Sequence, residues 1–247
     1  MRLVIGFLIA LALPIQAQAS CRQALALGLD VSGSVDLFEY RLQIDGLAGA
    51  LQRPEVQQAF LTFPEAPVRL FVYEWAGQDS RRILYPWTDI TSTDDLAALS
   101  TTLRATPRLE NEPATAIGEA MLFGARALLQ QNDCWRRTLD LSGDGKSNVG
   151  IRPRDLRNAP ELGDITINGL IVGSDALSTS DRRQAEIADL WAYFKIEVIR
   201  GPQAFVEVAV GFDDFEDAMA RKLLKELQTL AVSALPSPGA NDAAIRQ

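Results

Sequence analysis

The chain has 247 residues, of which 32 are acidic and 24 are basic, so its formal net charge is −8. An acidic balance disfavours nucleic acid and anionic lipid as partners, because both carry negative charge themselves. The sequence contains no histidine. This absence excludes Ser-His-Asp hydrolysis and the usual zinc enzymes, since both depend on imidazole.

The first 19 residues have the pattern of a secretory signal peptide. Arg2 precedes an unbroken apolar run over 3–13, and an Ala-x-Ala triplet ends at Ala19. We expect cleavage after Ala19 and export to the periplasm or out of the cell. No later segment is long and apolar enough to span a bilayer, so we expect no membrane insertion.

One domain is expected over residues 20–235, a length that supports a full hydrophobic core. The last residues, 236–247, are rich in Pro, Ser, Gly, Ala and Asn. This composition buries too little apolar surface to fold and predicts a disordered tail.

Within the domain, segments with strand patterns alternate with segments of helical period, which predicts an α/β fold. The turn between 68–75 and 82–87 predicts an antiparallel hairpin. The remaining strands alternate with helices, so we expect a doubly wound, mostly parallel sheet with one antiparallel edge strand and helices on both faces. The expected strands are 24–29, 68–75, 82–87, 138–141, 165–172 and 194–199, with a weaker edge segment at 205–210. The expected helices are 37–51, 93–103, 116–131, 153–158, 180–192 and 213–232, and 55–67 is interpreted as a connection.

Polar residues follow the first predicted strand in the pattern Asp30-x-Ser32-x-Ser34. A carboxylate and two hydroxyls on a loop beyond the carboxyl end of a strand suit a hard cation that takes oxygen ligands. The same residues also suit a simpler role, in which Ser34 or Asp36 caps the helix that follows. The pattern by itself leaves both interpretations open.

Two later polar groups can reach the same edge of such a sheet. Thr115 lies at the mouth of a predicted helix, where a hydroxyl serves either as a cap or as a ligand. Asp144 follows the strand 138–141 in a loop punctuated by glycines. Ligands of open α/β sheets bind beyond the carboxyl ends of the strands, where the strand order reverses.

Cys21 and Cys134 are the two cysteines of the chain. Cys21 lies nine residues before Asp30, and Cys134 lies ten residues before Asp144. If the two strands are parallel neighbours, the cysteines are level at the opposite edge of the sheet, close enough for a disulfide. Two free thiols remain the alternative.

Asp30-x-Ser32-x-Ser34, Thr115 after a polar loop, and Asp144 followed by Gly145 together resemble the metal-ion-dependent adhesion site of von Willebrand factor A domains. The resemblance covers about residues 23–231. The exported single-domain form is also similar to a bacterial family of von Willebrand A-like proteins catalogued as a domain of unknown function.

The resemblance implies a Mg²⁺ or Mn²⁺ ion held by Ser32, Ser34 and Thr115, with Asp30 and Asp144 acting directly or through water. It also implies a free position for an acidic group of a partner.

The sequence departs from the family pattern at two places near these ligands. Pro113-Ala114 stands where glycine usually precedes the threonine, and Ser142-Gly143 stands where threonine commonly precedes the aspartate.

The function expected from these observations is an exported, non-catalytic module that binds a protein or peptide carboxylate through the metal. A metal-dependent hydrolase with Asp30 or a serine as nucleophile is one alternative. A structural protein of an envelope assembly with a vestigial site is another.

Other residues that could have a function are given simpler interpretations. Lys146 is interpreted as exposed, and the tryptophans as packing residues: Trp75, Trp87, Trp135 and Trp191.

Overall fold

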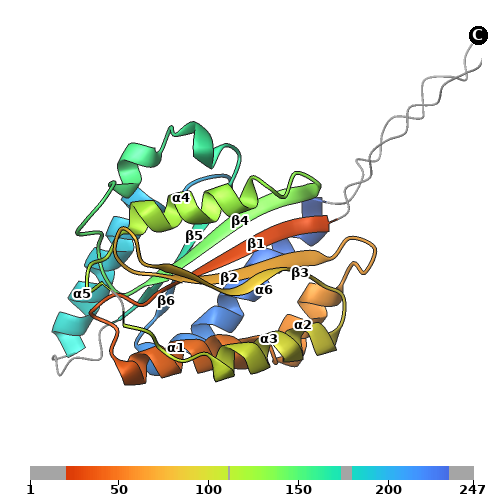
Figure 1. Cartoon of the computed structure of the whole chain (residues 1–247), viewed down its shortest axis with the longest axis horizontal. Coiled ribbons are helices and arrows are strands. Elements are labelled where there is room, and N and C mark those ends of the chain that lie inside the picture. The colour runs from red at the N-terminus through yellow and green to blue at the C-terminus, as the bar shows by residue number, and fades with distance from the viewer. Residues whose placement is uncertain (1–20, 111, 174–179, 234–247) are drawn as a thin grey trace, which may run out of the picture.

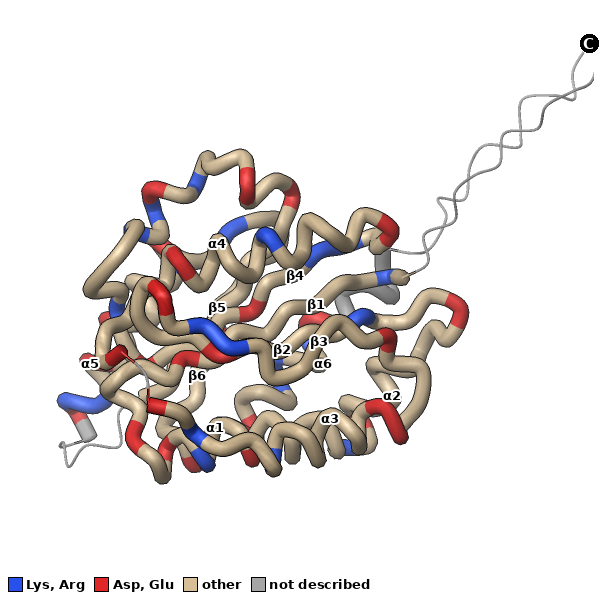
Figure 2. Tube along the Cα trace, viewed as in Figure 1, with Lys and Arg blue, Asp and Glu red and all other residues tan. Residues whose placement is uncertain are grey.

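The computed structural model describes residues 21–110, 112–173 and 180–233. The signal peptide expected at 1–19 and the tail expected at 236–247 lie outside the described residues. Over the described part of the chain, no helix is both long and apolar enough to cross a membrane. Acidic and basic residues are interspersed along the visible trace, over helices and loops alike (Figure 2).

Six strands form a single sheet in the order β3-β2-β1-β4-β5-β6. The β2–β3 pair is antiparallel and the other four pairs are parallel, which confirms the predicted sheet with its antiparallel edge strand. The strands are β1 (Cys21–Asp30), β2 (Val68–Trp75), β3 (Arg81–Ile90), β4 (Cys134–Gly143), β5 (Thr166–Val172) and β6 (Val206–Ala209).

Helices cover both faces of the sheet, as Figure 1 shows. One face carries α1 (Leu37–Ala50), α2 (Pro54–Leu61), α3 (Thr93–Ala105) and α6 (Phe215–Ser233). The other face carries α4 (Ile117–Leu128) and α5 (Ser180–Tyr193). Short 3-10 turns lie at Pro153–Leu156, Pro160–Leu162 and Phe212–Asp214, and a π-helical turn lies at Phe194–Val198.

Strand β1 forms the centre of the sheet and is buried along its whole length. Its side chains alternate between two cores, as the pleat of a strand requires. Leu25, Leu27 and Leu29 pack in the core beneath α1 and α6, whereas Ala24 and Ala26 pack in the core beneath α4. This burial on both faces explains why residues 24–29 are apolar without interruption.

The strand order reverses at β1. The chain passes from β1 to β2 on one side of it, and later returns to place β4 on its other side. The carboxyl ends of β1 and β4 therefore border the crevice in which α/β sheets bind ligands. At the opposite edge, Cys21 is the register partner of Cys134. Their Cα atoms are 4.5 Å apart and their sulfur atoms form a disulfide, as predicted.

The interpretation of 55–67 as a connection is wrong for its first half, because this stretch contains most of α2 (Pro54–Leu61). Pro54 occupies the first turn, where the missing N–H costs nothing. Val56 and Phe60, four residues apart, are both buried. The prolines that suggested a loop thus begin and follow a short helix.

The strand predicted at 194–199 is also wrong. The chain instead continues from α5 into the π-helical turn Phe194–Val198. Phe194 and Val198 are buried, but Ile196 between them is 63% exposed. An alternating apolar pattern fits a strand equally well, and the position beside β5 is occupied by β6.

The structure also corrects one smaller prediction, on the tryptophans, and decides another, on the cap of the first helix. Two of the four tryptophans are substantially exposed, Trp135 at 52% and Trp191 at 41%, so packing accounts only for Trp75 and Trp87. Asp36, one of the two candidates for the cap of the first helix, is its N-cap and forms a capping box with Glu39.

Candidate metal site

All five predicted ligands lie at the crevice between the carboxyl ends of β1 and β4. Asp30 is the last residue of β1, and Ser32 and Ser34 lie in the turn before α1. Thr115 precedes α4, and Asp144 directly follows β4. Asp30, Ser32 and Thr115 are at most 5% exposed, whereas Ser34 is exposed, so the group opens to solvent on one side.

The hydroxyls and one carboxylate form a continuous chain of hydrogen bonds. Thr115 Oγ1 donates to Ser32 Oγ at 3.2 Å, and Ser32 Oγ lies 3.3 Å from Ser34 Oγ. Ser34 Oγ in turn donates to Asp144 Oδ1 at 2.8 Å. Residues up to 112 positions apart in the sequence therefore place their oxygen atoms within one small volume.

Only one of the two carboxylate oxygens of Asp30 has a hydrogen-bond partner. Its Oδ1 accepts the Ser32 backbone N–H at 2.8 Å, but its Oδ2 is buried without a hydrogen-bond partner. A buried carboxylate oxygen without a partner carries a desolvation cost. Gly143 lets this oxygen sit close to β4, since a Cβ at position 143 would be 3.1 Å from Oδ2.

The charge of the Asp30 carboxyl is disfavoured by the residues around it. Burial, together with repulsion from Asp144, raises the pKa of Asp30 to about 8. Burial also raises the pKa of Asp144. A cation between the two groups would reverse both effects, because an opposite charge favours the ionised form.

Backbone contacts bring the two ligand loops together. The Gly33 N–H donates to Pro113 O at 3.0 Å. A Cβ on Gly33 would lie 2.7 Å from Pro113 Cβ, so glycine is required for the approach. The Pro113-Ala114 departure from the usual sequence is therefore part of the contact that places Thr115 beside Ser32.

Sequence reasoning missed the residues that hold these ligands. Asn148 Oδ1 accepts the Thr115 N–H at 2.9 Å, and the Asn148 N–H donates to Thr115 O at 2.9 Å. Gln43 Nε2 donates to Asp30 O at 2.9 Å, and Ser142 Oγ donates to Gln43 Oε1 at 3.2 Å. Asn148 lies in the loop already singled out for Asp144, but only the polar character of Gln43 on the apolar stripe of α1 signalled its role.

The donor set fits a hard divalent cation. The described residues contain no cluster of three or more Asp, Glu, Cys or His side chains, so the site combines two carboxylates with three neutral hydroxyls. Oxygen ligands of this kind match Mg²⁺ or Mn²⁺ and not the softer metals. The unpartnered Oδ2 of Asp30 provides a buried oxygen for such an ion or its bound water.

Lys146 is exposed, as predicted, and forms an ion pair of 2.6 Å with Asp189 of α5. Its Nζ also lies 5.8 Å from the centroid of the Tyr193 ring. The tyrosine hydroxyl accepts the Ser147 N–H at 3.3 Å. The loop that carries Asp144 is therefore attached to α5 by side-chain contacts.

A family model described as "Protein of unknown function (DUF1194)" matches residues 20–231. The chain belongs to the DUF1194 family. None of the curated proteins matches the sequence of this DUF1194 chain. Its fold is that of von Willebrand A domains, as comparison with solved structures shows.

A von Willebrand factor type A protein from Catenulispora acidiphila is 17% identical, with a TM-score of 0.55 over 84% of this chain and 43% of the other. Proximal thread matrix protein 1 from the mussel byssus, with a zinc-occupied MIDAS motif, is 16% identical, with a TM-score of 0.54 over 85% and 47%. An aerotolerance-related membrane protein from Bacteroides fragilis is 14% identical, with a TM-score of 0.52 over 82% and 98%.

This DUF1194 chain spans half or less of the length of the first structures it matches. At identities below 20%, the likeness establishes the fold. The function has to be argued from the site itself.

Proposed function

We propose that this protein is an exported binding module that holds Mg²⁺ or Mn²⁺ at the Asp30–Asp144 crevice and uses the ion to bind a carboxylate of a protein or peptide partner. The observation that carries the proposal is the buried, unpartnered Oδ2 of Asp30 beside three hydroxyls and a second carboxylate. The zinc-occupied MIDAS motif of the mussel protein, a structure of the same fold, also supports it.

Each residue has a distinct part in the proposal. Ser32, Ser34 and Thr115 supply neutral oxygen atoms, and Asp30 and Asp144 supply the negative charge. Two carboxylates balance the charge of a divalent cation, and the bound ion supplies an electrophilic centre for a further carboxylate. The exposed side of the site at Ser34 gives that carboxylate access.

Magnesium titration of the purified protein by calorimetry tests the metal site. We expect the unchanged protein to bind Mg²⁺. Ser34→Ala and Thr115→Ala should each lose at least about tenfold in affinity, because each variant removes a ligand or a group that supports one. Thr101→Ala is the matched control, since Thr101 is exposed on α3 and, within the described part of the chain, its hydroxyl bonds only to Ala97 O of its own helix. Equal affinity for all four proteins would contradict the proposal.

Capture of partners from an envelope extract, with Mg²⁺ and with excess chelator, tests the second half. We expect capture that depends on Mg²⁺ and is lost in Asp30→Ala. Capture that persists in chelator would instead assign a structural role to a vestigial site. Metal-dependent turnover of a generic phosphate or ester substrate, lost in Asp30→Ala, would assign a hydrolase.

A further inference from the structure

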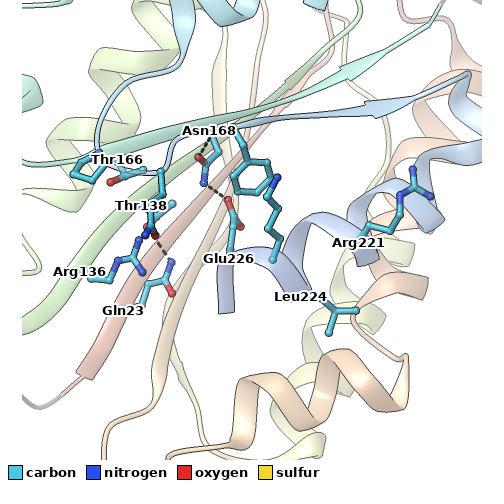
Figure 3. A pocket seen from close by; sticks show the side chains of 12 residues that line it. Gln23, Arg136, Thr138, Thr166, Asn168, Arg221, Leu224 and Glu226 are labelled. Atoms are coloured by element: carbon cyan, nitrogen blue, oxygen red, sulfur yellow. Dashed lines mark hydrogen bonds between the residues drawn. The ribbon is translucent and has the colours of Figure 1, made fainter. Parts of the chain in front are cut away.

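A pocket of about 600 Å³ opens at the amino-terminal edge of the sheet, opposite the metal site. Figure 3 shows side chains from β1, β4, β5 and α6 around it. Its volume is that of a small-molecule site. Phe205 and Leu224 supply apolar surface on the wall.

The wall of the pocket that the sheet supplies is polar. A sheet face that a helix covers is usually apolar. Gln23 of β1 is the register partner of Arg136 of β4, and Thr138 of β4 is the partner of Thr166 of β5. Register partners in parallel strands share a face. Further along β1, the same face carries the leucines that pack beneath α6.

Two side chains in the pocket lack hydrogen-bond partners of opposite kinds. Gln23 is 1% exposed, and its Nε2 donates to Thr138 Oγ1 at 2.9 Å, but its Oε1 has no partner. The guanidinium of Arg136 makes no hydrogen bond or ion pair with any described residue, although it is half-buried and attracted at longer range by Glu226. Among the described residues, Gln23 Oε1 therefore lacks a donor and the Arg136 guanidinium lacks an acceptor.

The neighbouring carboxylates form their short ion pairs with Lys222 and not with Arg136. Lys222 Nζ pairs with Asp140 and, at 3.0 Å, with Glu226. Asn168 Nδ2 donates to Glu226 Oε1 at 2.6 Å. Asn168 Oδ1 accepts the Phe205 N–H at 3.1 Å, so these polar groups are connected to one another without Arg136.

We propose that this pocket binds a small organic carboxylate that carries a neighbouring hydroxyl or ammonium group. The carboxylate accepts hydrogen bonds from Arg136, whose planar fork matches its geometry. The hydroxyl or ammonium group donates to Oε1 of Gln23. The two sites lie at opposite edges of the sheet, so the proposal does not depend on the metal site.

Matched pairs of probes test the two halves of this recognition. L-malate and succinate differ by one hydroxyl, and L-glutamate and glutarate differ by one ammonium group. Calorimetry in excess chelator, on the Asp30→Asn background, prevents the probes from binding through a metal. We expect L-malate or L-glutamate to bind more tightly than its partner by about tenfold, the effect of one hydrogen bond to a buried acceptor.

The chain also offers a matched pair of arginines. Arg136→Gln removes the pocket cation, whereas Arg137→Gln changes the next residue of β4, which points to the other face and bonds to Asp164. We expect Arg136→Gln to lose about tenfold or more in affinity and Arg137→Gln to bind like the parent. If Arg136→Gln does not fold, Gln23→Glu replaces it, since its carboxylate pairs with Arg136 and displaces the probe.

Binding of none of the four probes would overturn the proposal. Equal losses in Arg136→Gln and Arg137→Gln would also overturn it, as would succinate and glutarate binding as tightly as their substituted partners.

Discussion

Asp30 carries a structural cost that its proposed role as a metal ligand would explain. Its carboxyl is buried, one oxygen has no partner, and Asp144 repels its charge. A residue placed for stability alone would not be left in this state, because an unpaired buried charge is unfavourable. The arrangement is explained if the site is built for a cation that the folded chain itself does not supply.

Asp30→Asn should therefore stabilise the metal-free protein while abolishing its stabilisation by Mg²⁺. The pKa of Asp30 is raised from 3.8 to about 8, so its contribution to stability is fully present below about pH 4 and is lost as the pH rises through about 8. The gain in stability of Asp30→Asn should grow over this window. Thermal unfolding in chelator at several pH values measures it, and a variant less stable than the parent at high pH would contradict the prediction.

Among the helices, α3 shows how local polar contacts define a helix start. Thr93 looks suitable as its cap, but the cap is Ser92, whose Oγ accepts the Asp95 N–H at 3.3 Å. Asp95 Oδ2 accepts the N–H groups of Thr91 and Ser92, each at 2.9 Å. These bonds lower the pKa of Asp95, with the Thr91 N–H as the largest cause.

Ser92→Ala should lower the free energy of unfolding by about 1 kcal/mol, the usual effect of losing an N-cap. Thr101→Ala, on the exposed face of the same helix, should change it by less. Urea unfolding at neutral pH compares the two variants. Because the pKa of Asp95 is lowered, its share of the capping is present above its ordinary value of 3.8 and lost as the pH falls below that value. A variant as stable as the parent would show that the cap contributes nothing.

Helix α6 carries a charged residue on its buried side. Lys222 is fully buried and compensates both Asp140 and Glu226. Burial raises the pKa of Asp140 to about 7, although Lys222 opposes the shift. The attachment of α6 to the sheet thus depends on a charge balance as well as on its apolar stripe.

Lys222→Met should destabilise the fold by about 3–5 kcal/mol at neutral pH, because it leaves buried carboxylates without a cation. The loss should be smaller at acid pH, since a carboxyl with a raised pKa is protonated there at little cost. Chemical unfolding at about pH 5 and pH 8 tests the trend. Lys225→Met is the control, because Lys225 is exposed and stacks on Phe205; equal losses in both variants would contradict the account.

For the molecule as a whole, the disulfide joins the first strand to the fourth at the edge opposite the proposed metal site. It links positions separated by 113 residues. Closing so long a loop restricts the unfolded chain strongly.

Reduction of the disulfide should lower the free energy of unfolding by about 3–5 kcal/mol. It should leave magnesium affinity unchanged in the protein that remains folded, because the bridge and the site lie at opposite edges. Intact-mass measurement after alkylation, with and without reductant, establishes the bridge in solution, and unfolding curves of both forms give its contribution. Unchanged stability on reduction would contradict this role.

The sequence predicted most elements because their signals are local. Periods of 2 and 3.6 residues distinguish strand from helix wherever one face is buried, and the run 24–29 matched β1 for that reason. The same signals failed at α2 and at Phe194–Val198. Short segments contain too few periods to decide, and contacts with the rest of the fold determine their structure.

By itself, the sequence determined most of the strands and helices in their order, the Asp30-x-Ser32-x-Ser34 turn and the level placement of Cys21 and Cys134. Only the tertiary structure decided that Thr115 and Asp144 meet that turn, and that Asn148 and Gln43 hold it. It also decided that polar residues of three strands and α6 enclose a second pocket. The physical reason is that backbone patterning acts over a few residues, whereas these sites arise from strand order and register, which join positions about a hundred residues apart.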